Sequence, residues 1–111
     1  MPPAFLTSQP DANSLRVSLQ SGACNAESIC EELLTEVATR DPQLRAFAWL
    51  EPEHIRQQAQ RLDAQFARSG PVGPAHGLPL ALKDIIDTAG IPTENGTALD
   101  VGRIPTRQAA V

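Results

Sequence analysis

The sequence has 111 residues, of which 41% are hydrophobic and 20% charged, and its formal net charge is −4. This composition is typical of one modest globular domain and excludes a disordered or membrane-embedded chain. The mild acidity argues against a nucleic-acid partner, because Arg103 and Arg107 are the nearest approach to a basic cluster.

The first residues and the two cysteines indicate the cellular compartment to expect. The start, MPPAFLTSQPDANSL, lacks the basic and continuous apolar regions of a signal peptide, and no run approaches the ~18 apolar residues of a membrane span. Cys24 and Cys30 have no second pair and no nearby histidine, which favours reduced thiols over a zinc site, with Cys30 facing the core. We therefore expect a cytoplasmic protein without membrane contact, metal or cofactor.

The first two helices are predicted from their caps. DANSLRVSLQSG predicts a short helix that is capped by Asp11 or Asn13 and ends at Gly22. Asn25 is the expected N-cap of a longer helix over AESICEELLTEVATR, which Asp41-Pro42 would end. The apolar stripe of this longer helix comprises Ile29, Cys30, Leu33, Leu34 and Val37.

A third helix is predicted after a short apolar link. The link AFAWL, residues 46–50, has a strand-like composition. Glu51-Pro52 then opens the helix, since proline is tolerated in a first turn, and Ser69-Gly70 stops it. Its expected buried face is Ile55, Ala59, Leu62 and Phe66, and its expected solvent face is Arg56, Gln57, Gln60, Arg61 and Asp63.

The remaining residues, 70–111, are expected to form a strand and a series of turns. SGPVGPAHG is a turn region, and Leu78 to Leu82 has the character of a buried strand. Gly90, Pro92 and Asn95-Gly96 mark successive turns, and TRQAAV resembles the start of a helix. The chain thus divides into an N-terminal helix or tail (1–22), a helical segment (23–69) and a strand with turns (70–111).

Lys83, which directly follows the predicted strand, is the only lysine among nine basic residues. An amine buried beside apolar residues favours its neutral form, which can accept a proton from a hydroxyl and so generate an alkoxide nucleophile. Arginine cannot do this, because it does not deprotonate in proteins. A lysine at the end of a strand is more often a surface residue with its amine in water, so the residue pattern alone favours that simpler interpretation.

Three neighbouring polar residues have simpler interpretations than catalysis. Asp84 and Asp87 could pair in acid–base or metal chemistry, but they lack a third ligand, and we expect them to cap and turn the chain, with Asp84 orienting Lys83. His76 could be a base, yet a positional role is expected at this place beside Gly77.

The segment GPAHGLPLALKDIIDTAGIPTENGT, residues 73–97, closely resembles the N-terminal part of the amidase signature family. It matches that family's pattern G-P-x-x-G-[IVL]-P-[ILV]-x-[VIL]-K-D-x-[IF]-D-[TV]-A-G-x-P-T, and GRIPTRQAAV is similar to the segment G-R-x-P-x-R-D-A-x-V that follows. The resemblance extends from about residue 14 to the end, and KDIIDTAGIPTENGT resembles the smaller bacterial members of malonamidase type.

This resemblance implies a fold and a chemistry. The fold would be α/β: N-terminal helices and the first strand or strands of an incomplete mixed sheet, with residues 1–111 as the N-terminal part of an amidase-signature domain. The activity would be hydrolysis of a small-molecule C–N amide by a Ser–cis-Ser–Lys triad. Lys83 would take the lysine role, Asp84 would support it, and no cofactor or metal is implied.

Two departures from the family limit this expectation. The family's serines follow the lysine, but this sequence has no serine after Ser69, and Gln108 stands where the family usually has Asp. We therefore expect the chain alone to be inactive and to need the remainder of the domain, with a homodimer also open. Three alternatives stay open: a truncated or split partner chain without catalysis, the amidase subunit of a tRNA-dependent amidotransferase, and an allophanate hydrolase.

Overall fold

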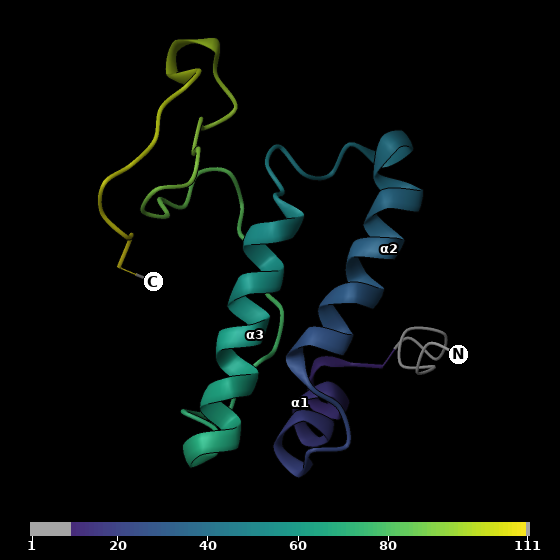
Figure 1. Ribbon diagram of the computed structural model, residues 1–111. Helices are drawn as coiled ribbons and strands as arrows, with labels where there is room; N and C mark the ends of the chain where they lie inside the picture. The colour runs from purple at the N-terminus through teal and green to yellow at the C-terminus, as the bar shows by residue number, and fades with distance from the viewer. Residues whose placement is uncertain (1–9, 111) are drawn as a thin grey trace. The chain divides into compact units, whose positions relative to one another are not determined.

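The computed structural model describes residues 10–110, and Figure 1 shows its three α-helices. Compact packing divides the chain into two units, Met1–Pro79 and Leu80–Val111. We call their described parts the helical unit (10–79) and the loop unit (80–110). The helical unit holds α1 (Ala12–Ser21), α2 (Ala26–Leu44) and α3 (Pro52–Ser69), and the loop unit holds a short 3-10 helix, η1 (Ala98–Asp100).

Polar caps set the start of α1 and α2 as the sequence predicted. The Asp11 carboxylate accepts a hydrogen bond of 2.7 Å from the Ser14 N–H, and α1 ends at Gly22, whose φ of 76° suits glycine. Asn25 and Ser28 form a reciprocal capping box at the start of α2. Each cap satisfies N–H groups that the first turn of a helix leaves without an intrahelical acceptor.

The third helix also begins and ends where predicted. Glu51 is its N-cap, and Pro52 occupies the first helical position, where the missing N–H removes no helical hydrogen bond. The helix stops at Gly70, whose N–H donates to the Phe66 carbonyl and whose φ is 75°. Local chemistry therefore determines both ends of α3.

The predicted end of α2 at Asp41-Pro42 is wrong, because the helix continues through Pro42 to Leu44. Proline removes one helical hydrogen bond, but its fixed φ is compatible with a helix, and α2 ends only two residues later. Arg45 closes the helix in the left-handed conformation, with its N–H donating to the Asp41 carbonyl at 2.7 Å. The Asp41 side chain also accepts a hydrogen bond from the Ala46 N–H, just after the end of the helix.

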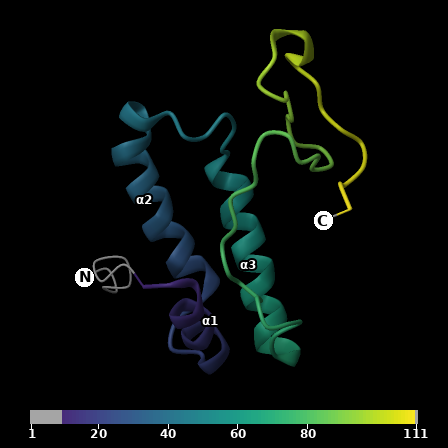
Figure 2. The same cartoon turned by 180° about the vertical axis from the view of Figure 1, so that it is seen from behind.

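Helices α2 and α3 lie side by side and enclose the core of the helical unit, as both ribbon views show (Figures 1 and 2). Ala26, Cys30 and Ala59 form the buried cluster, with Ile55 and Leu62 packed against it. Ile29 is also buried, with 1% of its surface exposed. The prediction that Cys30 faces the core is confirmed, and the small alanines let the two helices approach closely.

Polar contacts also join α3 to α2. Arg56 donates to both carboxylate oxygens of Glu31, at 2.5 and 3.2 Å. Asp63 accepts hydrogen bonds from the N–H groups of Ala26 (2.8 Å) and Glu27 (3.0 Å), at the first turn of α2. The prediction that Asp63 faces water is therefore wrong, since its carboxylate caps a neighbouring helix.

Residues 71–79 turn back from the end of α3 and pack onto the helices (Figure 2). Gly77 is buried, with φ of 81°, and a Cβ there would lie 3.2 Å from a Leu19 methyl carbon and 3.4 Å from Ala26 Cβ. Only glycine fits this conformation and this close approach. The Gln20 side chain adds a hydrogen bond of 3.2 Å to the Pro74 carbonyl.

The predicted α/β fold is contradicted, because residues 10–110 contain helices and turns but no β-strand. The strand expected at Leu78 to Leu82 is an irregular segment, in which Leu80 has 82% of its surface exposed. The link at 46–50 is also irregular. A strand requires a neighbouring strand as its hydrogen-bonding partner, and none of the described residues supplies one to residues 80–82.

The loop unit is held together by backbone hydrogen bonds between two antiparallel segments, 87–93 and 103–109. The N–H of Thr93 donates to the Arg103 carbonyl at 3.1 Å, and that of Gly90 to the Pro105 carbonyl at 2.9 Å. At the far end of the two segments, the Ala109 N–H donates to the Asp87 carbonyl at 2.9 Å. The helix expected to start at TRQAAV is absent from residues 106–110, and Val111 lies outside the described residues.

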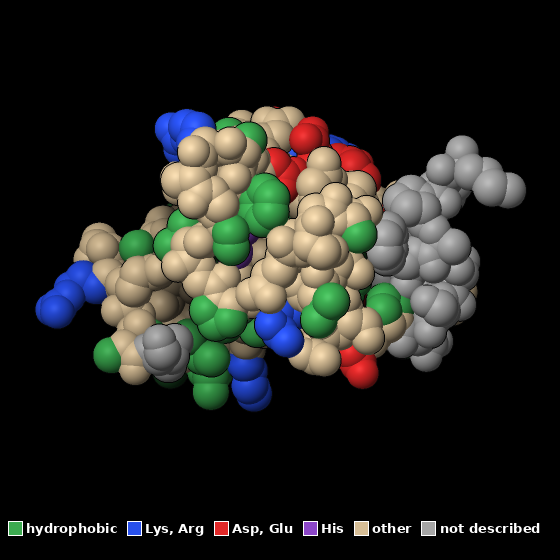
Figure 3. Space-filling view, turned by 90° about the horizontal axis from the view of Figure 1, so that it is seen from below, with side chains coloured by type: hydrophobic (Ala, Val, Ile, Leu, Met, Phe, Trp, Pro, Cys, Tyr) green, Lys and Arg blue, Asp and Glu red, His purple; other side chains and the backbone are tan. Residues whose placement is uncertain are grey.

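Apolar side chains reach the molecular surface, as the green atoms of Figure 3 show for one face. In the loop unit, the exposed large apolar residues are Leu80, Leu82, Ile85, Leu99, Val101 and Ile104. No helix within residues 10–110 is long and apolar enough to cross a membrane.

Candidate functional site

Lys83 lies at the start of a turn in the loop unit. Its carbonyl accepts a hydrogen bond of 3.0 Å from the Ile86 N–H, and its side chain is exposed. Across the described part of the chain, no hydrogen bond or ion pair engages its amine. The atom that would accept a proton is therefore accessible, and the described residues do not supply the desolvation expected from Leu78 to Leu82.

Asp84, the expected supporting residue, closes the loop that follows Lys83. One carboxylate oxygen accepts from the Glu94 N–H at 3.0 Å, and the Asp84 carbonyl accepts from the Asn95 N–H at 2.9 Å. Asn95 and Gly96 have positive φ values of 56° and 68°, which confirms the predicted turn. Asp84 thus fixes the backbone beside Lys83, and its carboxylate engages that turn.

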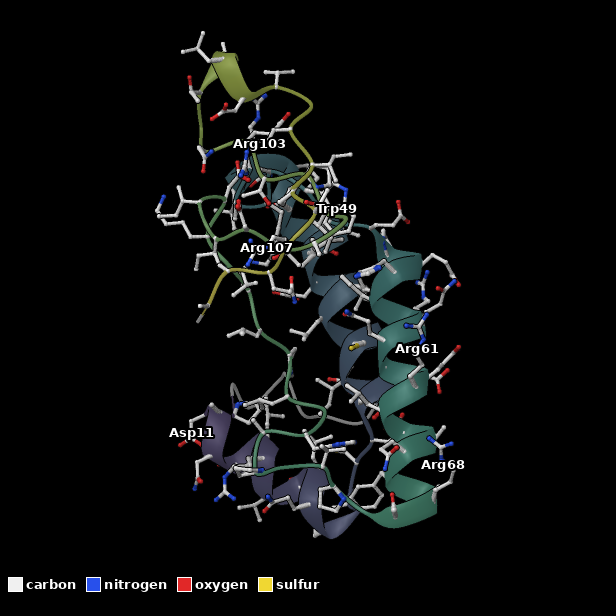
Figure 4. All side chains as sticks on the ribbon, turned by 90° about the vertical axis from the view of Figure 1, so that its left-hand side faces the viewer. Asp11, Trp49, Arg61, Arg68, Arg103 and Arg107 are labelled. Carbon is white, nitrogen blue, oxygen red and sulfur yellow. The ribbon has the colours of Figure 1, made fainter. Side chains whose placement is uncertain are left out.

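Asp87 forms an ion pair that the sequence did not predict. The Arg103 guanidinium donates to both Asp87 carboxylate oxygens, at 2.6 and 2.8 Å, and to the Thr93 carbonyl at 3.1 Å. Hydrogen bonding from Arg103 lowers the pKa of Asp87, and the same bond raises the pKa of Arg103. The two residues are 16 positions apart in the sequence, and Figure 4 shows Arg103 among the side chains of the loop unit.

Gln108 makes a polar contact at the position where the family usually has Asp. Its side-chain oxygen accepts a hydrogen bond of 2.8 Å from the Ala89 N–H. A carboxylate oxygen accepts from a backbone N–H in the same way. The departure from the family's pattern therefore leaves a hydrogen-bond acceptor at this position.

His76 has a structural role within the helical unit. Its Nδ1 accepts from the Val72 N–H at 3.1 Å, so the proton is assigned to Nε2, which donates to the Leu62 carbonyl at 2.8 Å. Its ring also lies 6.1 Å from that of Phe66, measured between centroids. Both ring nitrogens are engaged, so this residue joins the 71–79 segment to α3.

The cysteines have the properties of structural thiols. Both are free, and burial followed by the negative charge of Asp63 raises the pKa of each. Within residues 10–110, no group of three or more His, Cys, Asp or Glu side chains could hold a metal ion.

Comparison with known proteins identifies the relatives of this chain. The family model described as Amidase matches residues 28–111. Similar proteins include a Glutamyl-tRNA(Gln) amidotransferase subunit from Streptomyces coelicolor, 35% identical over 90% of this chain, and its namesake from Roseiflexus sp., 33% identical over 94% of it. The chain spans only 20% and 21% of the lengths of these two relatives. Because the family match covers most of the sequence and runs through Lys83, Asp87 and Arg103, this chain belongs to the amidase family.

Proposed function

We propose that this chain is the N-terminal part of an amidase-signature domain that hydrolyses C–N amide bonds, with Lys83 as its base. The observation that carries the proposal is the family match over residues 28–111, which contains the lysine motif LPLALKD. The chain spans about a fifth of its relatives' length, so the serines of the triad would come from polypeptide outside these 111 residues.

The chemistry assigns one proton transfer to Lys83. Its neutral amine accepts the proton of a bridging serine, which in turn takes the proton of the nucleophilic serine. The nucleophile's oxygen forms a bond to the amide carbon, the C–N bond breaks, and the amine leaves with a proton. Water then hydrolyses the acyl-enzyme and regenerates the serine.

The local structure supports this role in two ways. Lys83 directly precedes a loop that Asp84 closes with two hydrogen bonds, so the backbone that carries the amine is anchored. The amine is also exposed and accessible to another part of the domain. A polypeptide that covered Leu80 and Leu82 would supply the desolvation that favours a neutral amine.

A second candidate is the amidase subunit of a tRNA-dependent amidotransferase. Its support is the name of the relatives, which are Glutamyl-tRNA(Gln) amidotransferase subunits at 31–37% identity. Amidation of glutamyl-tRNA(Gln) by the complete protein and its other subunits would favour this candidate. Hydrolysis of small amides without any effect on that tRNA would favour an independent amidase.

The test of Lys83 is substitution in the complete amidase that contains this chain. We expect Lys83→Ala and Lys83→Arg each to reduce ammonia release from an amide substrate by at least ~100-fold, since general-base catalysis contributes about 10²–10⁴-fold. Lys83→Arg separates positive charge from proton acceptance, because arginine keeps its proton.

The control is Arg107→Ala, which removes an exposed basic side chain from the same unit and should leave turnover near wild type. Undiminished turnover in Lys83→Ala would reject the base assignment. If a complete, folded protein with intact Lys83 hydrolyses no amide, the chain is instead a non-catalytic partner.

A further inference from the structure

Lys83 is attached to a closed loop of residues 84–95. The carboxylate and the carbonyl of Asp84 both bind backbone N–H groups at its far end, on Glu94 and Asn95. The Lys83 carbonyl accepts from the Ile86 N–H at its near end. The direction in which the lysine leaves the backbone therefore depends on the shape of this loop.

Arg103 lies outside this loop and ties its two arms together. Its guanidinium binds the Asp87 carboxylate in the first arm through two N–H groups, and it donates to the Thr93 carbonyl in the second arm. Its own carbonyl accepts from the Thr93 N–H at 3.1 Å. Thr93 is buried, with 2% of its surface exposed, so these contacts lie in the interior of the loop unit.

We propose that Arg103 is a positioning residue for Lys83: by clamping Asp87 to Thr93 it fixes the loop that aims the catalytic amine. This inference rests on the proposed function of Lys83. A base must lie within hydrogen-bond reach of the proton it accepts, and a displacement of ~1 Å can reduce the rate ~100-fold. Arginine suits the task because its planar fork binds a carboxylate through two parallel hydrogen bonds, which a lysine cannot do.

The first experiment measures amide hydrogen exchange by NMR in the full 111-residue chain. In Arg103→Met, we expect the amides of Ile86, Glu94 and Asn95 to exchange at least tenfold faster, with α2 and α3 unchanged. The matched control is Arg107→Met, since Arg107 is exposed and its side chain makes no polar contact within residues 10–110. Equal exchange in the two variants, or equal acceleration throughout the helices, would overturn the proposal.

The second experiment measures kcat and KM in the complete amidase. We expect Arg103→Met to reduce kcat ~100-fold with KM nearly unchanged, and Arg103→Lys to recover part of that loss, because a lysine restores the charge without the fork. A loss confined to KM, or kcat equal to that of Arg107→Met, would overturn the positioning role.

The experiments distinguish failure of Lys83 as the base from failure of Arg103 as its positioning residue. If Lys83→Ala keeps full turnover, the base assignment is wrong, even where Arg103→Met loosens the loop. If Lys83→Ala is inactive while Arg103→Met leaves loop exchange and kcat unchanged, Lys83 stands as the base and the positioning role of Arg103 is overturned.

Discussion

At the scale of single residues, Asp63 shows how one side chain can organise two helices. It belongs to α3, but its carboxylate accepts hydrogen bonds from the N–H groups of Ala26 and Glu27 at the start of α2. These donors have no acceptor inside their own helix, and a negative charge is favourable near a helix N-terminus. Asn25 caps the same helix through Ser28, so the two acceptors serve different N–H groups.

We expect Asp63→Ala to reduce the free energy of unfolding by about 2 kcal/mol, because it leaves two part-buried N–H groups without their charged acceptor. Asp63→Asn keeps one acceptor oxygen and should lose less. The measurement is urea denaturation of each variant, followed by circular dichroism at 222 nm. Arg61→Ala, an exposed position on the same helix (Figure 4), is the control; an equal loss in Arg61→Ala would refute the capping role of Asp63.

Sequence proximity decided which residues could be predicted. The caps Asp11, Asn25 and Glu51 act on N–H groups two or three residues away, so their chemistry is visible in the sequence. Asp63 acts on residues 36 and 37 positions away, and a polar residue beside an apolar stripe resembles an ordinary solvent-facing one. The Asp87–Arg103 pair could not be predicted for the same reason, whereas the proposal for Lys83 rests on a contiguous motif and needs no structural information.

At the scale of elements, helices were predicted well and the strand was not. A helix satisfies its backbone hydrogen bonds within its own segment, and its caps and apolar period are therefore sufficient to predict it. A strand at Leu78 to Leu82 depends on another strand that the described residues do not contain. The apolar run correctly indicates residues suited to burial, but Leu80 and Leu82 remain exposed here.

The free energy of unfolding of the α2–α3 pair should depend on pH because of Glu31. Hydrogen bonding from Arg56 lowers the pKa of Glu31 below its ordinary value of 4.5. Because the folded pKa is the lower one, the stabilisation is fully present above pH 4.5 and is lost as pH falls through the folded pKa. We expect wild type to be more stable than Glu31→Gln above this range, with the difference shrinking in acid.

Denaturant titrations at a series of pH values would measure this difference. Glu36→Gln is the control, since Glu36 pairs with Arg40 one turn along α2 and does not join two helices. The plot of its free energy of unfolding against pH should run parallel to that of wild type. A Glu31→Gln curve that also ran parallel would show that the bond to Arg56 contributes nothing to folding.

At the scale of the whole molecule, the boundary between the two units follows Pro79, ten residues beyond Ser69, the last residue of α3. The intervening segment packs onto all three helices. Gly77 lies against Leu19 of α1 and Ala26 of α2, and His76 binds the Leu62 carbonyl of α3. A chain cut after Gly70 would lose these contacts, whereas one cut after Pro79 would keep them.

We therefore expect residues 1–79 to retain the helical circular dichroism of the full chain and a similar urea midpoint for the helical transition. Residues 1–70 should unfold at a clearly lower urea concentration, because Leu19 and Ala26 become more exposed and the hydrogen bond from His76 to the Leu62 carbonyl is lost. Gly77→Val in the 1–79 chain should reproduce much of that loss, since its Cβ would lie 3.2 Å from a Leu19 methyl carbon in a backbone conformation that β-branched residues avoid. Equal midpoints for the 70-residue and 79-residue chains would show that the helices form their core without the 71–79 segment, and that its packing follows from the fold without contributing to it.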